Sequence, residues 1–314
     1  MVRDRHCSRT AWSAALVLMA LIGLPPVAAG EPLSCPPLKL APRLAPDTVT
    51  HGKGLLWRLE RGSIDPSYIF GTIHVSDARI LNIPAPFKDA LRRSRSFVME
   101  ALFDEQSLTE FATLMHYGDT TELEEQVGRA LFERTQELLA QYGIPPVAAQ
   151  TMRPWAAFMT LNQPSDEVGL PLDLVLMQEA RARQMPVYGL ETLQEQAEVL
   201  QSLALADQIA LLRDSVCYFD LIQEEIEQLE RLYLDRDLAG IVALTLQYEG
   251  SDPALGDRVN EAIIVKRNRR MVQRMRPRLA EGGALVAIGA LHLPGDAGVL
   301  SLLEQQGYRV TPVY

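Results

Sequence analysis

The stretch Tyr68-Ile69-Phe70-Gly71-Thr72-Ile73-His74 sets the fold of this chain, and Leu285-Val286-Ala287-Ile288-Gly289-Ala290-Leu291-His292 repeats its pattern near the other end. Both are apolar runs rich in β-branched residues, which predicts buried strands. Both end in Gly-x-x-His. This spacing places a glycine where a neighbour comes close. It also places a histidine at the carboxyl end of the strand, the edge at which open α/β sheets bind ligands.

Gly-x-x-His occurs more often in this sequence than chance predicts. With 20 glycines and 5 histidines among 314 residues, random placement predicts about 0.3 such matches. The sequence has two, each after an apolar run. One strand-end histidine alone would favour a plain backbone hydrogen bond, whereas two in the same context favour a shared functional role. Asp77 and Asp296 follow the two histidines, and each is predicted to cap a helix or turn.

The first 29 residues have the three parts of a secretory signal peptide. Three arginines lie within the first nine residues, an apolar region covers residues 11–24, and Val27-Ala28-Ala29 is a small-residue cleavage site. We therefore expect a mature chain that begins near Gly30 and is periplasmic or secreted. A lipoprotein acylated at Cys35 is disfavoured, because Pro32-Leu33-Ser34 is a poor fit before that cysteine.

The charge of the chain limits its partners. Cleavage at residue 29 removes three Arg and one Asp, a net of +2, so the formal charge changes from −10 to −12. An acidic surface argues against nucleic acid or an anionic membrane as the partner. No second apolar stretch is long enough to span a bilayer. The sequence does not indicate an oligomeric state.

The mature chain keeps two cysteines, Cys35 and Cys217, after Cys7 is removed with the signal peptide. An even pair in an oxidising compartment favours one disulfide, which would tie the mature amino terminus to a central helix. Two unrelated thiols are the alternative.

The periodicity of the chain predicts one α/β domain over residues 30–314. Its central mixed sheet is flanked by helices and carries a large helical insertion at about residues 105–165 and 192–280. One expected helix runs over residues 122–142. The expected strands cover residues 55–60, 67–73, 97–101, 185–191, 285–292 and 308–313.

Four of these strands end in a histidine or a glutamate: His74, Glu100, Glu191 and His292. If the strands are parallel neighbours, the four side chains meet at one edge of the sheet. Imidazole with carboxylate is the ligand set of a divalent transition metal, which can activate water or polarise a carbonyl. A spare carboxylate would act as general base, and Lys266-Arg267 would hold a substrate carboxylate or an oxyanion.

Other catalytic patterns are missing from the sequence. It contains no His-Glu-x-x-His, no Gly-x-Ser-x-Gly, no P-loop and no dinucleotide fingerprint. Cys217 lies in an apolar-rich helical run, which is a poor setting for a nucleophile. A group of four glutamates is predicted to form the solvated face of one helix and not a metal site: Glu224, Glu225, Glu227 and Glu230.

The motifs together resemble the TraB/GumN family, to which the animal Tiki proteins are related. The resemblance covers about residues 55–313 and rests on Phe70-Gly71-Thr72-Ile73-His74, Val98-Met99-Glu100, Gly189-Leu190-Glu191, Lys266-Arg267-Asn268 and the segment from Ala287 to Gly295. It implies a core related to the ChaN-like and erythromycin-esterase-like proteins. Tiki proteins are described as metal-dependent proteases.

Residue by residue, the resemblance implies that His74, Glu100 and His292 hold the metal. Glu191 and Arg267 match further family positions, and we expect them to take part in catalysis with Glu100. Many members have a Gly-x-Asp before the middle helix. Here extra residues separate Gly169 from Asp173, so the resemblance does not assign Asp173.

Two functions follow as hypotheses. The first is an exported metal-dependent hydrolase, most simply a peptidase acting on a peptide or protein, with Mn²⁺, Co²⁺ or Zn²⁺ as its cofactor. The second is a non-catalytic protein that sequesters a peptide or a haem-like ligand with the same two histidines. Glu100 separates them, because hydrolysis needs a ligand or base at that position and sequestration does not.

Overall fold

The computed structural model describes residues 33–42, 44–165, 169–249 and 252–314. The predicted signal peptide, residues 1–29, lies outside the described residues. The described residues belong to one compact unit. Among the residues described, no helix combines the length and the apolar character needed to cross a membrane.

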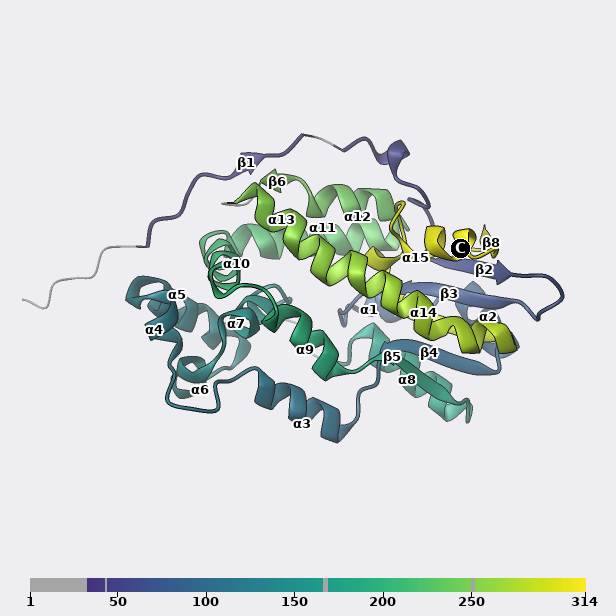
Figure 1. Ribbon diagram of the computed structural model, residues 1–314, viewed down its shortest axis with the longest axis horizontal. Helices are drawn as coiled ribbons and strands as arrows, with labels where there is room; N and C mark the ends of the chain where they lie inside the picture. Colours follow the sequence, from purple (N-terminus) through teal and green to yellow (C-terminus); the bar gives the residue numbers. More distant parts are fainter. Residues whose placement is uncertain (1–32, 43, 166–168, 250–251) are drawn as a thin grey trace, which may run out of the picture. The chain divides into compact units, whose positions relative to one another are not determined.

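A six-stranded mixed sheet forms the centre of this unit, with the order β5-β4-β7-β3-β2-β8 (Figure 1). The first four strands in this order are parallel, whereas β2 is antiparallel to both β3 and β8. The predicted α/β fold with a mixed sheet is therefore confirmed. The strands are β2 (Leu56–Glu60), β3 (Ser67–Thr72), β4 (Ser96–Ala101), β5 (Val187–Glu191), β7 (Ala284–Gly289) and β8 (Arg309–Pro312).

The two strands of the repeated motif are neighbours. β3 and β7 pair in parallel, with Gly71 opposite Ile288 and Thr72 opposite Gly289. A Cβ on Gly71 would come within 2.8 Å of the Leu293 side chain, which explains the glycine at this position. Nearly every residue of β3, β4 and β7 is buried, so both faces of the central sheet are covered, as parallel strands require.

Several helices share one apolar core with the sheet. They include α1 (Ala78–Leu81), α2 (Ala85–Arg93), α8 (Leu172–Ala182), α14 (Lys266–Glu281) and α15 (Val299–Gln305). α14 lies against β4, β5 and β7, and α8 lies against β4 and β5 (Figure 1). Asp77 caps α1, as predicted. Asp296 does not cap α15, because its carboxylate accepts a hydrogen bond from Thr50 and the helix begins after Gly298.

The remaining helices lie in two runs between strands. The first run is α3 (Glu105–Leu114), α4 (Leu123–Val127), α5 (Arg129–Leu139), α6 (Pro146–Thr151) and α7 (Pro154–Leu161). The second is α9 (Leu193–Gln201), α10 (Leu205–Cys217), α11 (Phe219–Leu234), α12 (Leu238–Thr245) and α13 (Pro253–Asn260). α7 packs on α10, so helices from both runs share a second apolar core, which includes Leu138, Trp155 and Leu212.

Two expectations for these runs were wrong. The helix expected over residues 122–142 is broken by Gly128, whose φ of 81° is open to glycine but costly for other residues. Glu230 is not solvated: it is buried and pairs with Arg79 at 3.1 Å. Glu227 does remain on an exposed face, so the run of glutamates follows the predicted pattern only in part.

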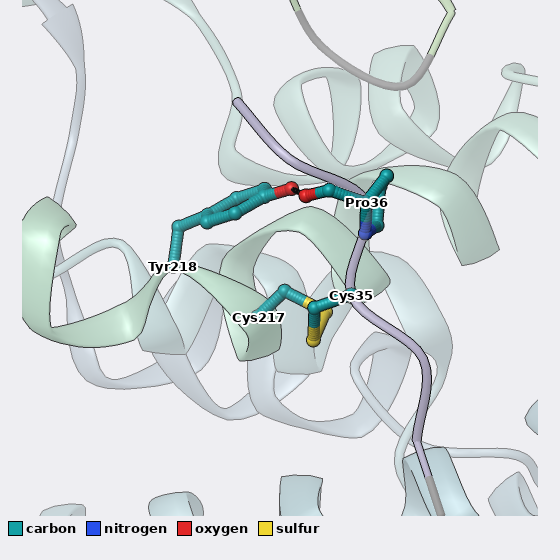
Figure 2. The surroundings of a disulfide bond; sticks show 4 residues. All are labelled: Cys35, Pro36, Cys217 and Tyr218. Atoms are coloured by element: carbon teal, nitrogen blue, oxygen red, sulfur yellow. Dashed lines mark hydrogen bonds between the residues drawn. A yellow bond between two sulfur atoms is a disulfide. The ribbon is translucent and has the colours of Figure 1, made fainter. Parts of the chain in front are cut away.

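The predicted disulfide joins Cys35 to Cys217, the last residue of α10 (Figure 2). The Tyr218 hydroxyl donates a hydrogen bond to the carbonyl of Pro36 beside it. Further along the same arm, β1 (Lys39–Leu40) pairs with β6 (Tyr248–Glu249). The amino-terminal arm is thus fixed covalently to the helical core and by hydrogen bonds at two further points.

Loss of this bridge should lower the stability of the protein. The bridge closes a loop across 182 residues, for which the chain-entropy model gives about 5 kcal/mol. We expect Cys35→Ser to lower the free energy of unfolding in urea by several kcal/mol, on the order of that figure. Reductant should lower wild-type stability by the same amount and leave the variant unchanged. Two free thiols in freshly exported, unreduced protein would contradict the bridge.

Candidate active site

The four predicted strand-end residues do come from adjacent parallel strands. Glu100 is in β4 and Glu191 is the last residue of β5. His74 lies two residues beyond β3, and His292 ends the 3₁₀ turn η4 (Ala290–His292) that follows β7. All four therefore lie at the carboxyl edge of the sheet, and His74, Glu100 and His292 line the same cavity.

His292 is buried, and Asn268 fixes the orientation of its imidazole. Its Nδ1 lies 2.7 Å from Oδ1 of Asn268. The amide nitrogen of Asn268 donates to the carbonyl of Ala297 at 2.8 Å, so the oxygen of the amide must face the imidazole. Nδ1 therefore carries the proton, and the lone pair of the neutral ring is on Nε2. Metal-binding histidines are oriented in this way.

His74 is held in a similar way by Asp173, in the first turn of α8. Its Nδ1 lies 2.7 Å from Oδ2 of Asp173, and the hydroxyl of Thr72 donates to the other oxygen at 2.6 Å. The backbone N–H of Leu172 donates to the carbonyl of Val75, which fixes the start of α8 next to the histidine loop. The carboxylate at this helix amino terminus is also favoured by the helix dipole.

Arg267 connects the two glutamates. Its Nε donates to Glu191 at 2.9 Å, its Nη2 to Glu100, and its Nη1 to the carbonyl of Ile263 at 3.4 Å. Glu191 also accepts from Arg270 at 3.3 Å and is fully buried. Lys266 is exposed, so Lys266 and Arg267 do not act as one cationic pair. Every guanidinium nitrogen of Arg267 already has a protein partner.

Both carboxylate oxygens of Glu100 are hydrogen-bonded. Oε1 accepts from Arg267 and from Gln196 at 3.1 Å. Oε2 accepts from the backbone N–H of Gly289 at 3.0 Å. Oε1 also lies 3.8 Å from Nε2 of His292. A Cβ on Gly289 would lie 3.4 Å from Oε2, an ordinary van der Waals contact, so this hydrogen bond comes from the backbone of the second motif and does not itself require its glycine.

The charges of these groups shift their pKa values in different directions. The charge of Asp173 raises the pKa of His74 to about 9, against the effect of burial. The side chain of His74 is 54% exposed, so solvent screens this pair. Burial lowers the pKa of His292 to about 4. Burial alone would raise the pKa of Glu100, but His292, Arg267 and His74 outweigh it and lower the value to about 2.

A π-helical turn, η3 (Glu261–Val265), leads directly into α14. Such turns are rare and are often found at functional sites. Ile263 and Ile264 in this turn line a cavity of about 280 Å³ that also contains both histidines. A second cavity of about 210 Å³ shares His74, Glu100, Ile263 and Arg267 with the first.

The side chains of His74, Glu100 and His292 meet some of the requirements of a metal site. Each histidine has Nδ1 committed to a side-chain oxygen, which leaves Nε2 for a transition metal. In His74 a metal would have to displace the proton that the raised pKa keeps on Nε2. The carboxylate of Glu100 is the right third donor, but Arg267 and Gln196 already bind one of its oxygens. Within the described part of the chain, no three His, Cys, Asp or Glu side chains are already arranged as a metal site.

The comparison with known proteins agrees with these motifs. Residues 55–312 match the model of the TraB/PrgY/gumN family. The chain belongs to this family. It is 25% identical to Metalloprotease TIKI2 of Danio rerio over 310 residues and to Metalloprotease TIKI1 of Homo sapiens over 314 residues. These alignments cover 81% of the chain but only 60% and 61% of the two relatives. No solved structure matches the chain.

The sequence predicted residues that the structure brings to one edge of the sheet, but it missed the residues that support them. Asp173 and Gln196 lie far along the chain from the residues that they bind, and no spacing connects them. Asn268 stood in the family motif, but only the structure shows that it orients His292. An acidic residue in the first turn of a helix, shortly after Gly169, is the signal that Asp173 did offer.

Removal of the arginine between the two glutamates should destabilise the fold. Arg267→Met leaves two buried carboxylates without their main counter-ion, which costs about 3–5 kcal/mol. The matched control on the same helix is Arg269→Met, because Arg269 is exposed and pairs weakly with Glu261 at 3.4 Å; we expect a change within about 0.5 kcal/mol. Equal loss of stability in both variants, measured by urea unfolding, would refute this role of Arg267.

Proposed function

We propose that this protein is an exported metal-dependent hydrolase, specifically a peptidase. His74 and His292 would hold the ion through Nε2, with Glu100 as the third protein ligand. Mn²⁺, Co²⁺ and Zn²⁺ all suit two imidazoles and a carboxylate. The single observation that carries the proposal is the matched support of the two imidazoles, each held at Nδ1 by a side-chain oxygen beside one cavity.

When bound, the ion would supply a Lewis acid that polarises a carbonyl and activates water. The protein supplies the rest. Asp173 and Asn268 fix the two imidazoles. Arg267 holds Glu100 beside His292. Glu191, fully buried and bonded to Arg267, acts on the site through Arg267 and does not itself touch the substrate.

The relatives support a peptide or protein as the substrate, since those aligned above carry the name metalloprotease. The chain spans about 60% of their length, so their activity is applied here only as a proposal. The cavity adds its own support, because it is open enough for the exposed ring of His74 to reach solvent.

A second function is favoured by a different observation. Glu100 already has hydrogen-bond partners on both oxygens, and a carboxylate held in this way is unsuited to work as a base. A protein that sequesters a peptide or a haem-like ligand through His74 and His292 would need no such base. Turnover by the wild-type protein separates the two functions.

Metal analysis of variants tests the ligand set. We expect His74→Ala and His292→Ala to lose at least about 100-fold in metal affinity, which is at the upper end of what loss of a supporting residue alone causes. Peptide hydrolysis should fall with it. His116→Ala is the control, because His116 binds Thr151 outside these cavities. Circular dichroism should show that all three variants fold.

Two outcomes of that experiment are decisive. Full metal content and full activity in the double variant at His74 and His292 would rule out the site. Glu100→Gln should lose metal if Glu100 is a ligand. Retained metal with lost turnover would instead assign Glu100 as the general base.

We also propose that the protein is periplasmic or secreted, on the basis of the basic, apolar and small-residue segments in residues 1–29. The Cys35–Cys217 disulfide supports an oxidising compartment. Amino-terminal sequencing of the protein from the exported fraction should find a start near Gly30. A soluble product in the cytoplasm that retains Met1 would overturn export.

A further inference from the structure

We propose that the site takes a peptide with large apolar side chains on both sides of the bond that is cleaved. This inference rests on the proposed peptidase function and adds its substrate class. It is drawn from two cavities that meet at the candidate catalytic residues, called here the α9 lobe and the α11 lobe after one helix that lines each.

The α9 lobe has a volume of about 210 Å³ and lies between helices of both insertion runs. Phe111 of α3, Phe158 and Met159 of α7, and Val199 and Leu200 of α9 form most of its wall. Besides the polar residues that line both lobes, the lining of the α9 lobe has one polar residue, Gln196. The amide of Gln196 donates to Glu100. The wall that remains for a ligand is therefore mostly apolar.

The α11 lobe has a volume of about 280 Å³ and lies over the ends of β3 and β7. Leu229 of α11, Ile241 of α12, Ile264 of the π turn and Leu291 of η4 form its apolar wall. The hydroxyl of Tyr233 in this wall already donates to the carbonyl of Gly71 at 2.8 Å. This lobe therefore also presents mainly carbon atoms to a ligand.

The two lobes meet at a small shared set of residues. His74, Glu100, Ile263 and Arg267 line both of them. Since the polar groups of this set are the candidate catalytic ones, a peptide bond held there has one lobe on each side. Ile263, placed by the π turn, is the apolar residue common to both walls.

The volume and the lack of charge of the two lobes determine which substrate side chains fit them. An apolar cavity of about 150 Å³ takes up benzene, so lobes of 210 and 280 Å³ each hold a leucine- or phenylalanine-sized side chain. Apart from the shared residues and His292, the described lining residues of both lobes carry no formal charge. A charged substrate side chain would lose its water there without gaining a partner, which is costly.

The test is digestion of a peptide library by the purified metal-loaded protein and its lobe variants. Wild-type protein should cleave between large apolar residues. Val199→Trp narrows the α9 lobe and Leu229→Trp narrows the α11 lobe, and each should lower kcat/KM for large residues on one side only, by about 10-fold or more. Val199→Ala and Leu229→Ala enlarge the same lobes, so each should shift the cleavage preference on its side toward larger residues. These two variants keep the test valid if a Trp variant fails to fold.

Matched controls lie on the same helices. Glu198 on α9 and Gln228 on α11 are exposed and absent from both lobes, so Glu198→Trp and Gln228→Trp should leave the preferences unchanged. Cleavage between charged or small residues at equal rates would overturn the inference. So would a variant of one lobe that changes the preference on both sides equally.

A binding measurement separates this inference from the peptidase proposal. Calorimetry would measure the affinity of the protein for two peptides, each with a reduced bond that cannot be cleaved. In one peptide this bond lies between two phenylalanines, and in the matched peptide it lies between two glutamates. If no peptide is cleaved, the peptidase function fails, but tighter binding of the apolar peptide, weakened by Val199→Trp and by Leu229→Trp, would still support the two lobes. Equal binding of both peptides would overturn the lobes whatever the activity.

Discussion

The buried ion pairs of Arg267 with Glu100 and Glu191 are the interaction on which the site depends. They join β4, β5 and the first turn of α14, three elements that are distant in sequence. Two carboxylates would be too costly to bury together without a cation between them. With Arg267 in place, Glu100 stays ionised beside His292. The next residue on the same helix, Asn268, then faces His292 and orients its imidazole.

The second constraint is the register of the sheet. Because β3 and β7 pair in parallel with Thr72 opposite Gly289, the chain leaves both strands at the same edge. Gly71 allows the chain to crowd at this edge, because a Cβ there would come within 2.8 Å of Leu293. Each histidine then lies two or three residues beyond a rigid strand, which positions it more accurately than a long loop would.

Sequence reasoning predicted the strands and the four strand-end residues because alternation, β-branching and Gly-x-x-His spacing are local signals. It could not predict the support of the site. Asp173 approaches His74 through the packing of α8, Gln196 approaches Glu100 through α9, and Arg267 is committed to two glutamates by their burial. These contacts depend on tertiary packing. The buried Glu230 was missed for the same reason, because its burial depends on the pairing with Arg79. The break at Gly128 has a different cause, since it depends on the positive φ of that glycine and on no neighbour.

The most direct test of this metal site is anomalous diffraction from crystals loaded with Co²⁺ or Zn²⁺. We predict one ion at about 2.0–2.2 Å from Nε2 of both His74 and His292 and from an oxygen of Glu100, with each Nδ1 still bound to Asp173 or Asn268. An ion bound elsewhere, or one that reaches only one of the two histidines, would contradict it.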